Sequence, residues 1–287
     1  MDLASLSEKI EKATEDYQRE AAEARRLVGQ QEQAVLDFCA RLLAVTRVVL
    51  DEKKAILPNR GWRVIVVSLA AKVISTVRAS LTLAEAGHAR EVDIPSRSAL
   101  EALITALFIA QKESVRRAKR WAQYAVLQKA RVLKKYPDLF KKPEHLKARA
   151  KILQHAGNLK KLFPNPNFWA SGLGKRGLRD LAEDVGMGWH YDMPYWSASQ
   201  STHGGAIAVD RYLDLDADGN PIYNVGLSLR NLHGELALCC NLLARTLVML
   251  NDVCKLELKQ ICDDLAVEYT TVFGGDPLQG DIDSGQR

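Results

Sequence analysis

The 287-residue sequence has only five cysteines and no long apolar run. The cysteines form no Cys-x-x-Cys pair and fall in apolar, helix-like settings, which favours buried free thiols over a zinc site or a disulfide framework. No run reaches the roughly 18 apolar residues that cross a bilayer. The acidic, amphipathic N-terminus also lacks the basic-then-apolar order of a signal peptide. We therefore expect a cytoplasmic protein that makes no membrane contact.

Cofactor motifs are also missing. The sequence has no P-loop and no Gly-x-Gly-x-x-Gly motif after a predicted strand, so nothing supports ATP or NAD binding. Glu85 and His88 have the Glu-x-x-His spacing of a di-iron helical bundle, but the second copy that such a site needs is absent. We expect neither a cofactor nor a metal ion.

Basic residues are plentiful but unevenly distributed. Residues 112–179 contain 19 Lys and Arg against three acidic residues, and residues 252–287 contain eight acidic residues against three basic ones. This segregation indicates either contact with a polyanion or solvated helix faces that pair with each other. On the first interpretation the basic helices bind nucleic acid, and the candidate residues are Arg116, Arg117, Arg120, Lys134 and Lys135.

Apolar residues recur every three or four positions through most of the chain, which is the spacing of amphipathic helices. Proline and serine begin several of these segments, at Pro95, Ser114 and Pro143. The last segment is long for one globular helix, so we expect it to bend. The predicted helices cover residues 3–54, 62–85, 95–111, 114–135, 143–157, 175–185 and 228–273.

The predicted fold class is all-α. It is a multi-helix bundle with a long, coiled-coil-like N-terminal helix and one small inserted β-hairpin at residues 210–228, around the turn at Asp218-Gly219. Residues 1–58 form the N-terminal association segment, residues 59–273 the helical core domain and residues 274–287 a disordered acidic tail. The coiled-coil-like stripe needs a partner helix, so we expect a homo-oligomer or a protein partner there.

Two segments carry polar residues where the helical pattern expects a core. Arg97 and Glu101 are four residues apart and share a face of their helix. In the stretch YWSASQSTHGGA, Tyr195, Ser199 and His203 also recur every four residues and share a face if the segment is helical.

The two faces together suggest a site for phosphate chemistry. Arg97 would hold an anion such as a phosphate, and His203 would act as the general base or acid. Glu101, Tyr195 and Ser199 would orient these groups. The alternative is a buried polar network that only fixes the register of the helices.

The motif Arg97-Ser-x-x-Glu101 and, about ninety residues later, the motif Tyr195-x-x-x-Ser199-x-x-x-His203-Gly resemble a family of uncharacterised bacterial all-helical proteins. The resemblance spans roughly residues 60–250. It implies an all-helical fold and a shared polar site at these five residues, without an established activity.

A looser similarity is to the HEPN helical effectors, which act on nucleotides or RNA in prokaryotic defence and toxin systems. Their ribonuclease members use an arginine followed four to six residues later by a histidine on one helix. No arginine has that spacing to His203. Arg149 and His155 have the spacing but lack the polar residue that usually follows the arginine.

Two functions are compatible with these observations. The first is a helical effector that acts on RNA or a nucleotide phosphate, for example as a metal-independent ribonuclease in antiviral defence, with the basic helices attracting the substrate. The second is a non-enzymatic binding or scaffold protein whose polar network is structural or senses a small anion. Loss of nuclease activity in His203→Ala at an unchanged melting temperature would favour the first.

Overall fold

The computed structural model describes residues 3–53, 61–140, 142–203, 205, 209, 211–223 and 226–274. The predicted loop at 53–61 and the predicted acidic tail lie almost entirely outside the described residues. In the described part of the chain helices dominate, so the all-α prediction is confirmed. The helices are α1 (Leu3–Lys53), α2 (Trp62–Glu85), α3 (Ala89–Gln111), α4 (Ser114–Lys135), α5 (Pro143–Leu159), α6 (Leu178–Asp184), α7 (Gly188–His190), α8 (Trp196–His203), α10 (Leu232–Cys254) and α11 (Lys259–Phe273).

Shorter elements connect these helices. Three 3₁₀ turns, η1 (Pro137–Phe140), η2 (Lys160–Leu162) and η3 (Trp169–Leu173), flank α5. The π-helical turn η4 (Tyr191–Tyr195) leads directly into α8. Two short strands, β1 (Leu213–Leu215) and β2 (Pro221–Tyr223), pair antiparallel with Leu213 opposite Tyr223. Gly219 has a φ of 81° in the turn between them, a conformation that favours glycine.

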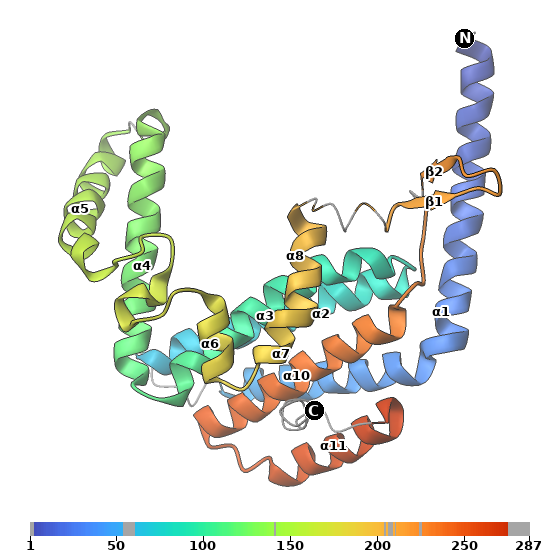
Figure 1. Ribbon diagram of the computed structural model, residues 1–287. Coiled ribbons are helices and arrows are strands. Elements are labelled where there is room, and N and C mark those ends of the chain that lie inside the picture. Colours follow the sequence, from blue (N-terminus) through green and yellow to red (C-terminus); the bar gives the residue numbers. More distant parts are fainter. Residues whose placement is uncertain are drawn as a thin grey trace.

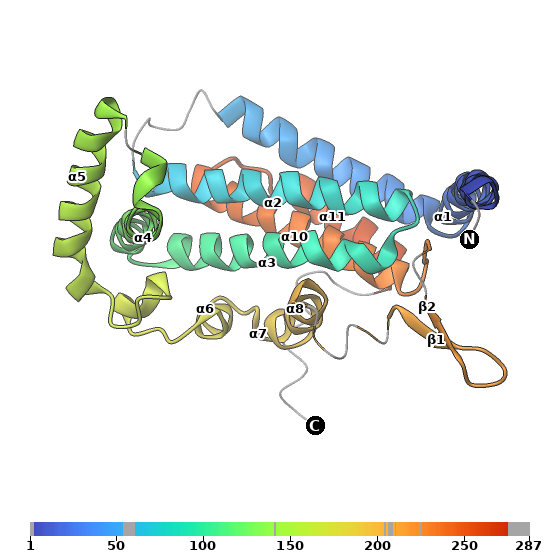
Figure 2. The same ribbon diagram turned by 90° about the horizontal axis from the view of Figure 1, so that it is seen from above.

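The core lies between α2, α3 and α10, with α1 and α11 on the far side of α10 from α8 (Figures 1 and 2). Apolar side chains at three- and four-residue spacing, such as Val73 and Val77 on α2, are fully buried there. Phe38 on α1 is also fully buried and lies edge-on to the ring of Tyr269 on α11, 6.1 Å between centroids. Burial of such faces is the main favourable contribution to the stability of the bundle.

Helix α1 has two parts with different surroundings. Val28, Val35, Leu42 and Val49 are buried in the same core as α2, α3 and α10. The N-terminal part extends away from the bundle (Figure 1, dark blue). The second half of α1 therefore belongs to the helical core, and the prediction of an association segment at residues 1–58 stays a prediction for the projecting part.

Two predicted helices differ most from the structure. Helix α3 begins at Ala89, six residues before the predicted start at Pro95. Proline in a second turn removes only one backbone donor, and the burial of Val92 and Ser96 on either side of it holds the helix together. The run predicted to bend forms two helices, α10 and α11, because Lys255 and Glu257 between them adopt positive φ.

Helices α2 and α10 are long and apolar enough to cross a membrane by length and composition alone. A search of the sequence for uninterrupted apolar runs misses these two helices, because single polar residues interrupt their apolar stretches. In the structure both pack against each other in the core, and a core helix of a bundle has the same composition.

Helices α4 and α5 form an arm that leaves the bundle as a helical hairpin (Figure 1, green). A second, small hydrophobic cluster holds its two helices together and includes Leu127, Ala130, Ala156, Leu159 and Phe163. The arm therefore has an interior of its own, separate from the main core.

Candidate functional site

Helix α8 packs on α3, and Ala198 lies at the centre of the contact with 1% of its surface exposed. The π-helical turn before α8 contains Pro194, which has no N–H to continue an α-helical ladder. One-turn π-helices are frequent at functional sites. Polar side chains of η4 and α8 reach α3 on the two flanks of Ala198, and they form two separate clusters.

The first cluster joins Arg97 to Tyr195. Nη2 of Arg97 donates a hydrogen bond to Oη of Tyr195 at 2.8 Å, and the guanidinium lies 4.8 Å from the centroid of the same ring. Tyr191 stacks on Tyr195 with 4.7 Å between centroids. Burial raises the pKa of the Tyr195 phenol, and the nearby carboxylate of Glu101 raises it further. The structure thus brings together two predicted site residues from distant segments, with a third close by.

The remaining predicted residues of this set lie elsewhere. Glu101 is exposed, and no ion pair joins it to Arg97 among the described side chains. A four-residue step advances by about 40° beyond a full turn, so Ser199 and His203 rotate progressively away from the face of Tyr195. His203 is exposed at the end of α8, roughly 12 Å along the helix from Tyr195. It makes no hydrogen bond with Arg97 or Glu101 in the described part of the chain, so the predicted Arg97 and His203 pair is not assembled.

The second cluster lies on the other flank of Ala198 and is centred on Asp93. Oδ2 of Asp93 accepts hydrogen bonds from Ser201 at 2.7 Å and from Arg211 at 2.5 Å. The same guanidinium donates to Oγ of Ser197 at 2.9 Å. Asp93 is 3% exposed, and burial raises its pKa although the bond from Ser201 and the charge of Arg211 oppose the rise.

Glu235, in the first turn of α10, faces this cluster. Nδ2 of Asn231 donates to its Oε1 at 3.2 Å, and the residue is 9% exposed. Burial raises the pKa of Glu235 to about 7, and the neighbouring Asp93 charge adds to the rise while Arg211 opposes it. This carboxyl therefore changes charge close to neutral pH.

A cavity of about 530 Å³ opens between α3, the α7–α8 segment and α10. Its wall includes Asp93, Ser197, Arg211 and Glu235, together with the half-exposed ring of Trp189. We call this cavity the acid pocket. Buried His190 also lines it, and its Nε2 lies 3.1 Å from Oδ1 of Asn241.

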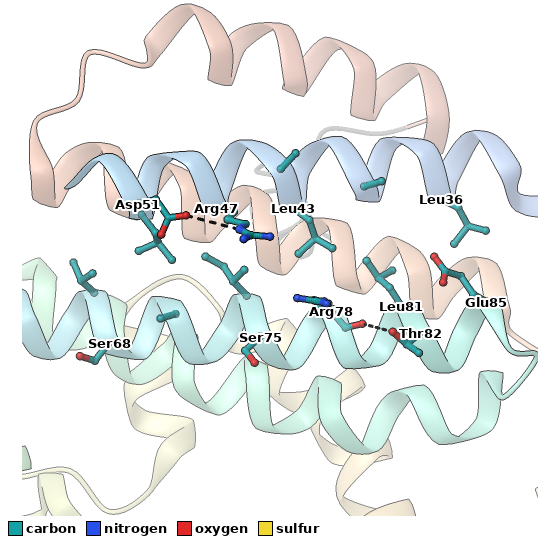
Figure 3. A pocket seen from close by; sticks show the side chains of 16 residues that line it. Leu36, Leu43, Arg47, Asp51, Ser68, Ser75, Arg78, Leu81, Thr82 and Glu85 are labelled. Atoms are coloured by element: carbon teal, nitrogen blue, oxygen red, sulfur yellow. Dashed lines mark hydrogen bonds and ion pairs between the residues drawn. The ribbon is translucent and has the colours of Figure 1, made fainter. Parts of the chain in front are cut away.

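A larger groove of about 720 Å³ lies between α1 and α2 (Figure 3). Leu36, Leu43 and Leu81 contribute to its mostly apolar lining. Arg47 and Asp51 of the same helix form an ion pair of 3.8 Å at its wall. A binding site usually combines apolar walls with convergent polar groups, and the acid pocket fits that description better than this groove.

The predicted nucleic-acid residues of α4 fall into different environments. Lys134 and Lys135 are exposed, and Arg116 forms an ion pair of 2.8 Å with Glu113. Arg120 is half-buried, with its guanidinium 5.7 Å from the ring centroid of Phe163. Arg117 differs most from its prediction, because it is only 3% exposed and donates a hydrogen bond to the backbone carbonyl of Phe108. Burial lowers its pKa, and it is not part of the surface.

The acid pocket is the part of the site that the sequence interpretation missed. Ser197 and Ser201 show the same four-residue spacing as Tyr195 and Ser199, so spacing alone did not separate the two faces. Asp93 precedes Arg97 by four residues, but it falls outside the predicted helix, which begins at Pro95. A helix start at Ala89 would have placed Asp93 and Arg97 on one face.

The fold and these clusters define an all-α protein with polar groups between helices distant in sequence. The chain belongs to the family of unknown function DUF5677, which matches residues 63–221, more than half of its length. No curated protein and no solved structure matches the chain. The matched region contains Asp93, Arg97, Tyr195 and Arg211, whereas Glu235 lies beyond it.

Proposed function

We propose that the protein is an enzyme that acts on RNA or a nucleotide, with a nucleobase bound in the acid pocket and Glu235 as the proton-transfer group. The observation that carries this proposal is the meeting of two buried carboxyl groups and an exposed tryptophan ring around one cavity of about 530 Å³. A cavity of this size lies within the range for small-molecule sites.

Nucleobases offer the two features that this lining recognises. Carboxylates accept hydrogen bonds from exocyclic amino groups, and aromatic rings stack on the faces of bases. Asp93 is held in place by Ser201 and Arg211, so its orientation is fixed before a ligand arrives. Trp189 is half-exposed and lines the pocket, so its ring can supply a stacking surface.

Glu235 suits proton transfer because a general acid or base works best when its pKa lies near the working pH. Its pKa of about 7 leaves the carboxyl partly protonated at neutrality. Arg211 lines the same pocket and would stabilise negative charge that develops on the substrate. We assign these roles to the acid pocket rather than to Arg97 and His203, because no hydrogen bond joins those two side chains in the described part of the chain.

The test compares two tryptophans of equal exposure. Trp189 is 49% exposed and lines the pocket, whereas Trp196 is 48% exposed and does not line it. In calorimetric titrations with the four ribonucleoside monophosphates, we expect Trp189→Ala to weaken binding about 5- to 100-fold, the range for one base–aromatic stack. Trp196→Ala should bind as the wild type does. Equal losses in both variants, or no binding of any nucleotide to the wild type, would refute the proposal.

A non-enzymatic ligand sensor is the second candidate, since hydrogen bonds of the pocket residues also join α8 to α3 and α7 to α10. Chromatography of nucleotides and RNA after incubation separates the two functions. Conversion by the wild type and none by Glu235→Gln supports the enzyme. Tight binding without conversion by either protein supports the sensor.

A further inference from the structure

The basic residues of the arm divide into two classes by their contacts. Residues 112–161 contain 16 Lys and Arg and three acidic residues. The arginines mostly point at backbone carbonyls: Arg117 at Phe108, Arg131 at Pro166 and Arg149 at Pro137. These arginines hold the arm together and attach it to its surroundings, and each has one N–H group engaged in doing so.

The lysines at the tip of the arm have a different environment. Lys134 and Lys135 end α4, and Lys142 precedes α5 across the short connection. All three are exposed, and none has an ion pair among the described side chains. The ion pair of Arg116 with Glu113 lies at the other end of α4. Residues 134–144 contain four lysines against Asp138 and Glu144, so this segment carries a net positive charge. A bound polyanion would reduce the repulsion among its lysines.

An aromatic ring lies among these lysines. Tyr136 is 47% exposed, and Nζ of Lys135 lies 5.3 Å from its ring centroid. Single-stranded nucleic acids are bound by this combination, in which bases stack on an exposed ring and cations follow the phosphates. The arm also projects from the bundle, so a strand can approach its tip without displacing another element (Figures 1 and 2).

We propose that the tip of the arm, formed by Lys134, Lys135, Tyr136 and Lys142, binds single-stranded nucleic acid through its phosphates and one stacked base. The tip is a second contact, separate from the acid pocket, and its binding does not depend on the chemistry proposed for Glu235. It replaces the interface predicted from sequence, in which Arg117 took part.

The experiment measures fluorescence anisotropy of a labelled mixed-sequence RNA of about 20 nucleotides, longer than the usual site size. The tip variant replaces Lys134, Lys135 and Lys142 with Gln. The control variant carries the same loss of charge at exposed lysines outside the arm: Lys12, Lys72 and Lys259. Since each phosphate contact on a single strand contributes about 0.7 to the slope of log K against log salt, losing three should lower the slope by about 2.

We expect the tip variant to bind RNA about tenfold or more weakly at moderate salt, and the control variant to stay within about threefold of the wild type. Replacing the same three lysines with Arg should restore binding, because the charges return. Tyr136→Ala should weaken RNA binding about fivefold or more and leave the binding of inorganic polyphosphate unchanged.

Three results would overturn the proposal. The first is equal RNA affinity of the tip and control variants. The second is RNA binding by the wild type that does not change with salt. The third is binding of the tip to phosphatidylserine vesicles without binding to RNA, which would assign this surface to a membrane.

Because the substituted lysines are exposed, the circular dichroism melting curves of the tip variant and the wild type should coincide. If they do not, the variant with Arg at the same three positions decides the outcome. Loss of nucleotide binding in Trp189→Ala with normal RNA binding at the tip would separate the two sites.

Discussion

Replacing Glu235 with Gln should make the protein more stable at alkaline pH. Gln has nearly the same shape and keeps an oxygen that can accept the hydrogen bond from Asn231. It cannot ionise, so it removes the cost of holding a charged carboxylate in the acid pocket. A difference in the free energy of unfolding between this variant and the wild type therefore reports the charge of Glu235 and not the packing of α10 against α3.

The size of this effect comes from the pKa of Glu235. Burial and the Asp93 charge raise this pKa from its ordinary 4.5 to about 7. At about 1.36 kcal/mol for each pKa unit, the rise corresponds to on the order of 3 kcal/mol. Between these two values the folded protein holds a proton that the unfolded chain releases. The stability of the wild type should therefore fall as pH rises from about 4.5 to about 7 and remain lower above that value.

Urea denaturation followed by circular dichroism measures the difference. At pH 8 Glu235→Gln should be more stable than the wild type by about 2–3 kcal/mol, and near pH 4.5 the two should agree closely. Glu15→Gln, an exposed carboxyl on α1, is the control and should follow the wild type at both pH values. A wild type and a Gln variant with parallel pH profiles would show that Glu235 is not buried as a charged group, and the proton-transfer role would fail with it.

Two further predictions test the packing around the site and in α1. Tyr195→Phe removes the hydroxyl that accepts the bond from Arg97 but keeps the stack on Tyr191, and urea titrations should show a loss of about 1–3 kcal/mol. An unchanged free energy of unfolding would mean that this bond does not hold η4 on α3. Phe38→Ala leaves a cavity beside Tyr269, and calorimetry should show that the free energy of unfolding falls by about 3–5 kcal/mol. A loss below about 1 kcal/mol would mean that the second half of α1 is not part of the core.

Helix boundaries were predictable from sequence where local chemistry defines them. Helices α2 and α4 have the bounds expected from apolar spacing, a glycine before Trp62 and Tyr136-Pro137 after Lys135. The start of α3 was not predictable in this way, because Pro95 is a common first residue of a helix but here lies in its second turn. Tertiary contacts decide that case: the backbone N–H of Ala89 donates to the carbonyl of Ser228 at 3.0 Å, far along the chain.

The candidate site could be predicted only in part, because the spacing of residues does not show how a helix is oriented in the fold. A four-residue pattern defines a face of a helix but not the direction in which that face points. Tyr195, the last residue of η4, meets Arg97 as expected, whereas Ser201 on α8 meets Asp93 on the other flank of Ala198. Only the burial of Ala198 between them fixes the orientation, and an alanine carries no signal that distinguishes it from the other alanines of the chain.

Glu235 shows most clearly how tertiary structure creates a site that the sequence does not mark. An acidic residue in the first turn of a helix ordinarily stays solvated, where the helix dipole favours its charge. Here the packing of α3 against α10 removes water from the carboxyl and brings Asp93 near it. Because Glu235 lies beyond residue 221, where the family match ends, the acid pocket is assembled from a matched half and an unmatched half. The family match therefore covers Asp93 and Arg211 but not the carboxyl to which we assign proton transfer, so membership of the family does not by itself imply the proposed chemistry.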